Sequence, residues 1–343
     1  MPAKKARQRR AATSEHDPGT DTARARAEEL DTSTPALVRL GGTPVRFGTA
    51  SWTDPTILAP GVFYPEGVKT PEARLKHYAR LFPMVEVDSS YYALPTPRMA
   101  ELWVERTPDE FVFDVKAFGW MTGHATEAQR LPRSLKDALP NELLAKKRLY
   151  SKDVPREIRD EAWRLFVEAV RPLHEAGKLG AVFLQYPSWV RPAAHSPEML
   201  ARARRRLGDL PIAVEFRHGD WMSASLRERT LALLRANEMS YVVVDEPQGF
   251  ASSVPPYAAV TAPRLAVVRM HGRRAETWEK PGTPAVERFR YLYDERELTP
   301  WVPKIVEVAG ESEQVHVVFN NCYGNYGTTN ALEMSSLVRN AEA

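Results

Sequence analysis

The sequence predicts an α/β protein, a single TIM-like (β/α)8 barrel. Short apolar segments alternate with helical patterns eight times along the chain, as expected where parallel strands are covered by helices. No Gly-x-Gly-x-x-Gly pattern follows any of these segments, which argues against an open doubly wound sheet with a dinucleotide site. The 343 residues suffice for one barrel, because barrels of ~250 residues or more form single domains. We predict this barrel over residues 43–335.

Residues 1–42 are predicted to form a disordered basic tail. The segment is poor in large apolar side chains, so it cannot bury enough surface to order itself. It opens with a basic cluster, Lys4, Lys5, Arg7, Arg9 and Arg10. Such a cluster can contact nucleic acid or an acidic surface, although we expect a solvated tail without a specific partner. Residues 336–343 are predicted to form a C-terminal extension.

Eight strands are expected, each short and rich in Val, Ile or Phe. They are residues 45–51, 84–90, 111–117, 181–186, 212–217, 241–245, 265–271 and 315–320. Helices are expected at residues 71–81, 98–105, 154–176, 197–207, 225–237 and 298–308. Thr70 precedes a proline at the first helical position, which is a typical helix start, and Thr96 does the same. Two segments interrupt the alternation, residues 122–151 and 247–263, and we expect both to be loops that shape a site.

Composition excludes several classes of protein. The one cysteine, Cys322, allows neither a disulfide framework nor a cysteine-rich zinc site, which suits a reducing compartment. No apolar run approaches the ~18 residues of a membrane span, and residues 1–30 have no apolar segment of a secretion signal. The net charge of +3 is mild for a dedicated nucleic-acid module. We expect a cytoplasmic protein without membrane contact.

Polar and aromatic motifs follow the predicted strands in a fixed order. They are FGTASW at 47–52, FYP at 63–65, VEVDSSYY at 85–92, FDVK at 113–116, LQYP at 184–187, EFRH at 215–218, RMHG at 269–272 and FNNC at 319–322. Together they resemble the YecE-like family, catalogued as domain of unknown function 72, over about residues 45–332. The resemblance implies a TIM-like barrel. It implies no activity, because the family has none assigned.

The predicted strands deliver polar side chains to one end of the barrel, where TIM-barrel chemistry takes place. In the strand that ends at residue 217, alternation puts Glu215 and Arg217 on one face and Val214 and Phe216 on the other. Buried charges are tolerated when they are paired or form a site, so Glu215 and Arg217 require partners from other strands. The other strands offer Glu86, Asp88, Ser90, Asp114, Lys116, Gln185, Asp245, Arg269, His271 and Asn320.

These charged residues allow two interpretations. Each residue alone fits a satisfied ion-pair network without a ligand, whereas charges on seven strands together favour a site, because stability alone does not require them. A divalent metal held by the carboxylates and His271 is the disfavoured alternative, since Lys116, Arg217 and Arg269 add positive charge where the metal would sit. The same three cations favour an anionic ligand group. We expect no cofactor.

Aromatic side chains also follow the strands. They include Trp52, Tyr92, Trp120, Trp189, Trp221 and Trp278. Each alone fits a cap on the core. Together they would line the barrel mouth with flat faces suited to a sugar ring, a nucleobase or single-stranded nucleic acid. Cys322 is a weak candidate nucleophile, because no histidine is adjacent to it in the sequence.

The leading hypothesis is an enzyme that acts on an anionic, ring-bearing substrate such as a sugar phosphate or a nucleotide. Glu215 is the expected central acid or base, with Asp88 or Asp245 as its partner and His271 as proton carrier. The expected binding residues are Lys116, Arg217, Arg269, Gln185, Asn320, Trp52, Tyr92 and Trp221.

The sequence leaves the reaction and two other classes of function open. Hydrolysis, isomerisation and lyase chemistry suit these residues equally. The alternatives to an enzyme are a nucleic-acid-binding module without turnover and a small-molecule sensor. Glu215 is expected to face a solvated pocket, so Glu215→Gln is expected to lose ligand binding while keeping nearly all stability.

Overall fold

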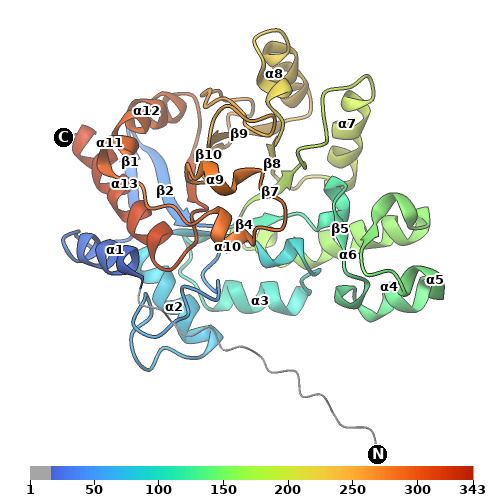
Figure 1. The fold of residues 1–343 in the computed structure, drawn as a ribbon, viewed down its shortest axis with the longest axis horizontal. Coiled ribbons are helices and arrows are strands. Elements are labelled where there is room, and N and C mark those ends of the chain that lie inside the picture. The colour runs from blue at the N-terminus through green and yellow to red at the C-terminus, as the bar shows by residue number, and fades with distance from the viewer. Residues whose placement is uncertain (1–16, 343) are drawn as a thin grey trace, which may run out of the picture.

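The computed structural model describes residues 17–342, which form a curled, mixed nine-stranded sheet with helices packed around it (Figure 1). The strand order is β1-β2-β11-β10-β9-β8-β7-β4-β3. Strand β1 (Leu37–Leu40) pairs antiparallel with β2 (Thr43–Thr49), and the other pairings in this sheet are parallel. The remaining strands are β3 (Met84–Val87), β4 (Val112–Lys116), β7 (Leu179–Gln185), β8 (Ile212–Glu215), β9 (Met239–Asp245), β10 (Ala266–Met270) and β11 (Val315–Phe319).

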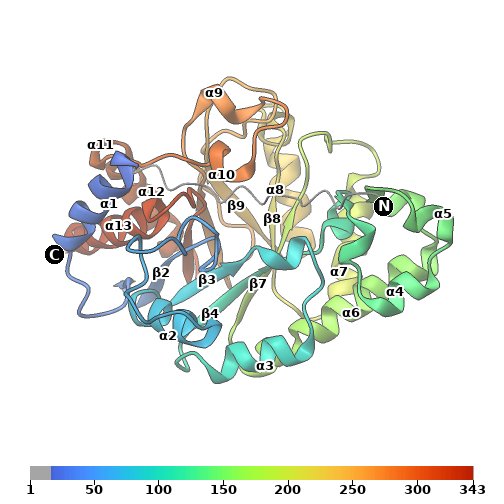
Figure 2. The same cartoon turned by 60° about the horizontal axis from the view of Figure 1, so that its bottom comes forward.

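The eight predicted strands are present, but the predicted closed (β/α)8 barrel is wrong. Closure would need a ladder between β2 and β3, and these strands are joined only through a single bridge, from Ala50 to Glu86. The sheet instead ends on β1 at one edge and on β3 at the other, and it curls into a half-barrel (Figure 2). Between β9 and β10 the described chain contains no helix, which confirms the interruption of the alternation expected at residues 247–263.

Most predicted helices form close to the expected residues. Helix α2 (Pro71–Leu81) begins at Thr70, whose hydroxyl accepts a hydrogen bond from the Ala73 N–H. The other long helices are α3 (Pro97–Glu105), α6 (Arg156–Glu175), α7 (Ser196–Leu207), α8 (Arg227–Ala236), α12 (Val302–Gly310) and α13 (Tyr326–Glu342). Short helices α9 (Ala275–Trp278), α10 (Ala285–Arg288) and α11 (Glu295–Leu298) lie between β10 and β11. In residues 17–342, no helix has both the length and the apolar character needed to cross a lipid bilayer.

The segment 122–151, expected to be a loop, contains secondary structure. Strands β5 (Ala125–Thr126) and β6 (Leu149–Tyr150) pair with each other, and α4 (Arg133–Ala138) and α5 (Asn141–Leu144) lie between them. Figures 1 and 2 place α4 and α5 beside α6, at the edge of the molecule. Leucines spaced four residues apart anchor this segment in the core: Leu131, Leu135 and Leu139. Leu135 lies within α4, whereas Leu131 and Leu139 flank it in extended backbone, so the leucine spacing does not mark the helix in the sequence.

The described part of the predicted tail also contains structure. Helix α1 (Pro18–Glu28) packs against α13, with Ala23 buried between them. Arg26 donates hydrogen bonds to both carboxylate oxygens of Glu333 at 2.6 Å, and Asp17 accepts one from Tyr326 at 2.7 Å. These polar contacts, rather than an apolar stripe, hold α1, so the hydrophobic pattern does not reveal it. The basic cluster at residues 4–10 lies outside the described residues, and α13 continues through the predicted boundary at residue 335.

Removing residues 1–34 is therefore expected to destabilise the protein, whereas loss of an unattached tail would leave the Tm unchanged. The truncated chain loses the ion pair between Arg26 and Glu333 and the burial of α1, which together stabilise by about 2–4 kcal/mol. For a chain of this size we expect a fall in Tm of roughly 5–10 °C, measured by circular dichroism. Arg26→Met should give a smaller fall. An unchanged Tm in the truncated chain would contradict the packing of α1.

Candidate functional site

A cavity of about 410 Å³ opens where the parallel strands end. Its wall is formed by residues at the ends of β4 and β7 and by segments that follow β2, β3, β8, β9, β10 and β11. The residues proposed for a site from sequence that line it are Asp88, Tyr92, Lys116, Gln185, Arg217 and Asn320. The half-barrel thus gathers side chains from many strands around one space although the sheet is not closed.

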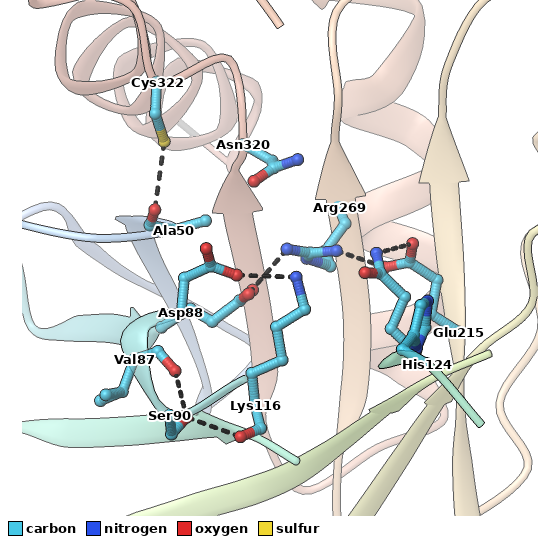
Figure 3. A network of polar contacts seen from close by, with 12 residues as sticks. Ala50, Val87, Asp88, Ser90, Lys116, His124, Glu215, Arg269, Asn320 and Cys322 are labelled. Carbon is cyan, nitrogen blue, oxygen red and sulfur yellow. Dashed lines mark hydrogen bonds and ion pairs between the residues drawn. The ribbon is translucent and has the colours of Figure 1, made fainter. Parts of the chain in front are cut away.

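A buried ion-pair network lies beneath this cavity (Figure 3). Arg269 donates one hydrogen bond from Nη2 to Glu86 Oε1 at 2.7 Å and another from Nη1 to Glu215 Oε2 at 2.5 Å. The second oxygen of Glu215 accepts hydrogen bonds from Gln185 Nε2 at 2.6 Å and from Arg217 Nη1 at 3.1 Å. Glu215 is only 2% exposed. Both of its carboxylate oxygens are therefore already occupied by donors.

Glu215 does not line the cavity, so it does not face solvent as the sequence analysis expected. Burial disfavours its charged form, but Arg269 and Arg217 outweigh burial and hold the pKa of Glu215 well below its usual range. A general acid or base must change protonation near the working pH. Buried and paired, Glu215 holds Gln185 and Arg217 by hydrogen bonds at the cavity floor.

His271 belongs to the same buried layer. Its Nε2 lies 3.1 Å from Arg217 Nη1, and its Nδ1 lies 2.9 Å from the side-chain amide of Asn320. Burial lowers the pKa of His271 to about 3, so the ring is neutral at neutral pH. The neutral ring positions Arg217 and Asn320, which do line the cavity.

Asp245, Trp52 and Trp221 do not line the cavity. Asp245 accepts hydrogen bonds from Arg273 Nη2 at 2.8 Å and from Trp301 Nε1 at 2.9 Å. Both tryptophans are buried and contact aromatic rings of the core. Strand alternation assigns a side chain to a face of the sheet, but it does not say how deep below the cavity the side chain lies.

Lys116 and Asp88 form an ion pair in the cavity wall (Figure 3), with Lys116 Nζ 2.7 Å from Asp88 Oδ1. Their side chains are 12% and 28% exposed. Burial disfavours the ammonium, but the carboxylate of Asp88 outweighs burial and raises the pKa of Lys116 above its ordinary value. The Ser90 hydroxyl donates to the Lys116 carbonyl at 2.6 Å and ties the ends of the two strands together. A ligand in the cavity can reach this pair.

The close approach of β2 and β3 shapes this wall. Gly48 permits the approach, because a Cβ there would lie 2.4 Å from the Met84 carbonyl oxygen. Three residues later, Ser51 lines the cavity with a backbone φ of 114°, a conformation that L-residues rarely adopt. Such strain is typical of functional sites, where the surrounding structure holds it in place.

Aromatic faces form another part of the wall. The guanidinium of Arg217 lies 4.6 Å from the ring centre of Trp278, and Phe289 packs edge-on against that tryptophan. Trp189 is 62% exposed, and its ring meets the ring of His124. The cavity therefore combines cations with flat apolar surfaces.

Two residues of the site, His124 and Glu246, were not predicted from the sequence. His124 lines the cavity, and its Nδ1 lies 2.9 Å from the Thr122 hydroxyl. Burial, with the charges of Lys116 and Arg217, lowers the pKa of His124 to about 4. Glu246 is buried behind Arg217, with its Oε2 3.3 Å from Arg217 Nη1. Signals for both existed, since His124 lies in the insertion expected to shape a site and Glu246 directly follows a predicted strand.

The carboxylates weighed as metal ligands already have cationic partners. Arg269 binds Glu86 and Glu215, and Arg273 binds Asp245. In the part of the chain that the structure describes, no group of three or more His, Cys, Asp or Glu could hold a metal ion.

Glu246 gives the site a testable pH dependence. Burial raises its pKa to about 8, so the folded protein keeps a proton that the unfolded chain loses above about pH 4.5. Stability is therefore lost as pH rises from about 5 to 8, by up to about 1.4 kcal/mol per pH unit for this group. Glu246→Gln is expected to reduce that loss, measured as urea unfolding at pH 5 and pH 8. Equal pH dependence in the two proteins would contradict the protonation of Glu246.

The fold and the site define a class: an α/β half-barrel with a polar cavity at the strand ends, above a buried carboxylate–guanidinium network. A family model described as "Protein of unknown function DUF72" matches residues 46–343. The chain belongs to this family, which confirms the resemblance drawn from the sequence motifs.

Similar proteins cover most of the chain. The UPF0759 protein YunF of Bacillus subtilis (strain 168) is 31% identical over 270 residues, which are 78% of this chain and 87% of that protein. The crystal structure of the DUF72 family protein EF0366 of Enterococcus faecalis V583 aligns with a TM-score of 0.68 and 26% identity, over 86% of this chain and 95% of that one. The DUF72 family protein TM1631 of Thermotoga maritima MSB8 aligns with a TM-score of 0.67 and 29% identity, over 86% and 98%. These names state a family and no activity.

Proposed function

We propose that the protein is an enzyme that binds a small, anionic, ring-bearing molecule in the cavity at the strand ends and catalyses a proton transfer on it. The observation that carries this proposal is the partly exposed ion pair between Lys116 and Asp88, which shares the cavity with Arg217 and with aromatic faces. A sugar phosphate or a nucleotide has the matching chemistry. The cavity volume of about 410 Å³ suits a ligand of that size.

Arg217 and Lys116 supply the anion-binding groups. Within residues 17–342, the polar contacts of Arg217 run through Nη1, to Glu215, Glu246 and His271. Nη2 and Nε are therefore available to an oxyanion. Lys116 uses Nζ to hold Asp88, and an ammonium has three donors. Lys116 ends β4 and Arg217 follows β8, so the two cations reach the cavity from different parts of its wall and can hold an anion between them.

Asp88, Lys116 and His124 supply the proton-transfer groups. Asp88 and the neutral ring of His124 reach the cavity as proton acceptors, and the ammonium of Lys116 reaches it as a donor. Glu215 and His271, the centre of the site expected from sequence, act as positioning residues in this proposal. Hydrolysis, isomerisation and lyase chemistry all require groups of this kind.

Single-stranded nucleic acid is a second candidate ligand, favoured by Trp189. This side chain is 62% exposed beside the cavity, and exposed aromatic faces stack on bases. A strand bound in this way would depend strongly on salt concentration, because its phosphates release counterions when they bind cations. Salt dependence therefore separates the two candidates.

A thermal-shift panel tests the proposed ligand class. The compounds are sugar phosphates, mononucleotides, the dephosphorylated form of each and a short single-stranded oligonucleotide. A ligand that binds only the folded protein raises its Tm, by an amount that grows with the ratio of concentration to Kd. We expect a rise with at least one phosphorylated compound and a smaller rise with its dephosphorylated form. The proposal fails if every phosphorylated compound leaves the Tm unchanged.

A further inference from the structure

Helices α6 and α7 pack side by side and carry a cluster of arginines outside the site described above. A cavity of about 480 Å³ between them is lined by five arginines and one glutamate: Arg156, Arg159, Arg202, Arg205, Arg206 and Glu198. Like charges at this density repel one another unless counter-charges compensate them.

Two carboxylates compensate this cluster only in part. Asp160 pairs with Arg206 and lies 3.5 Å from Arg156. Glu198 lies 2.8 Å from Arg205 and 3.6 Å from Arg202. Among the lining residues and Asp160, five guanidiniums stand against two carboxylates, an excess of three positive charges.

Arg159 is the cation with the weakest compensation. In the described part of the chain it forms no ion pair of 4.0 Å or less, and its buried Nε has no hydrogen-bond partner. Burial lowers the pKa of the neighbouring Arg206, and the charges of Arg202 and Arg159 lower it further. The cluster therefore has an excess of positive charge that an anion can neutralise.

A second, largely apolar cavity of about 330 Å³ adjoins the cluster. Its apolar lining includes Trp120, Met121, Trp163, Tyr186, Val190 and Met199. Arg159, Arg202 and Arg206 line both cavities, so guanidiniums stand at the border of an apolar space. No lining residue is shared with the cavity at the strand ends.

We infer that α6 and α7 form a second ligand site, for a small anionic molecule with a flat apolar body. The anion binds the guanidiniums of Arg159 and Arg202, and the apolar body enters the cavity beside Trp163 and Met199. Such a molecule is complementary to both spaces, because the cluster has more cations than carboxylates and the adjoining cavity is lined largely by apolar side chains. The N-terminal segment of the chain has the wrong charge for this site, because residues 4–10 are basic. A nucleic-acid backbone would match the arginines but would leave the apolar cavity unused.

Two fluorescent probes test the inference on the full chain. The anion 8-anilinonaphthalene-1-sulfonate has a sulfonate and a flat apolar body, and N-phenyl-1-naphthylamine is the same body without the charge. We expect the sulfonate to bind with one-to-one stoichiometry and with at least about tenfold higher affinity than the neutral probe, because a charged hydrogen bond provides a factor of this size. Equal affinity for the two probes would overturn the inference.

Variants assign this binding to the α6–α7 site. Arg159→Gln combined with Arg202→Gln should weaken sulfonate binding by about tenfold or more, whereas Glu198→Gln should tighten it, because the change releases Arg202 and Arg205. Because a loosened fold also binds more of this probe, the gain of affinity counts only with an unchanged Tm and an unchanged one-to-one stoichiometry. Arg164→Gln is the matched control, since Arg164 lies on α6, lines neither cavity and pairs with Glu161 and Glu168.

Two further results would overturn the inference. One is loss of sulfonate binding in Lys116→Met with no change in the arginine variants, which would place the probe in the cavity at the strand ends. The other is binding of a single-stranded oligonucleotide that depends on Arg159 and Arg202 when the sulfonate does not bind. That result would assign the cluster to phosphate backbones.

Discussion

Arg269→Met is expected to lower the free energy of unfolding by about 3–5 kcal/mol. Arg269 is 1% exposed and is the cation that Glu86 and Glu215 share, at 2.7 and 2.5 Å. Methionine has a similar length but leaves two buried carboxylates without this partner. Burial already raises the pKa of Glu86 to about 7 even with Arg269 present, so in the variant both carboxylates favour the protonated form. The deficit should therefore be larger at pH 8 than at pH 5, in urea unfolding curves.

Arg290→Met is the matched control for that variant. Arg290 also pairs with a carboxylate, Asp17 at 2.8 Å, and also lies over an aromatic ring, but its side chain is 34% exposed. Water replaces the lost partner there, so we expect a loss of about 1 kcal/mol or less. Similar losses in the two variants would mean that the buried network contributes no more than a surface pair. By the same reasoning, Glu215→Gln should destabilise clearly, in contrast to the small effect expected for a residue in a solvated pocket.

Lys116→Met is expected to weaken binding of a phosphorylated ligand about 100-fold while leaving the fold nearly as stable. A hydrogen bond between an ammonium and a phosphate contributes about 1.5–3 kcal/mol, and the charge interaction adds to it. Asp88 loses its partner, but its side chain is 28% exposed and water can replace the ammonium. Isothermal titration calorimetry measures the affinity, and the dephosphorylated form of the same ligand should bind both proteins equally.

Lys304→Met controls for the loss of a lysine. Lys304 Nζ donates to the Pro256 carbonyl at 2.9 Å and lies over the Trp301 ring, and Lys304 is not among the residues that line the cavity at the strand ends. Its replacement should leave ligand affinity unchanged. If Lys116→Met and Lys304→Met reduce affinity equally, or if neither does, Lys116 does not hold the anion.

The strands could be predicted from the sequence, but whether the sheet closes into a barrel could not. Parallel strands covered by helices are apolar throughout, and this pattern identified all eight. Closure depends on whether β2 and β3 pair, which the apolar pattern of the two strands does not encode. Strand β1 (Leu37–Leu40) is apolar at three of its four positions, but it is short and lies in a segment of otherwise polar composition. Helix α1 is held by ion pairs such as Arg26–Glu333, so it leaves no strong hydrophobic signal.

How deep each side chain lies below the cavity could not be predicted from the sequence. Alternation correctly groups Glu215 with Arg217, and the two side chains do touch. It does not show that Glu215 lies in a buried layer while Lys116 and Asp88 reach the cavity. That distinction arises from strand stagger and from the loops that cover each strand end. His124 reaches the cavity from the insertion after β4, so no periodicity marks it.

The most direct test of the proposed site is a crystal structure of the protein with the phosphorylated compound that gives the largest thermal shift. We predict that its phosphate oxygens lie within hydrogen-bond distance of Lys116 Nζ and the Arg217 guanidinium, with the ring against Trp278 or Trp189. A phosphate bound elsewhere, with the cavity at the strand ends left to solvent, would contradict the account.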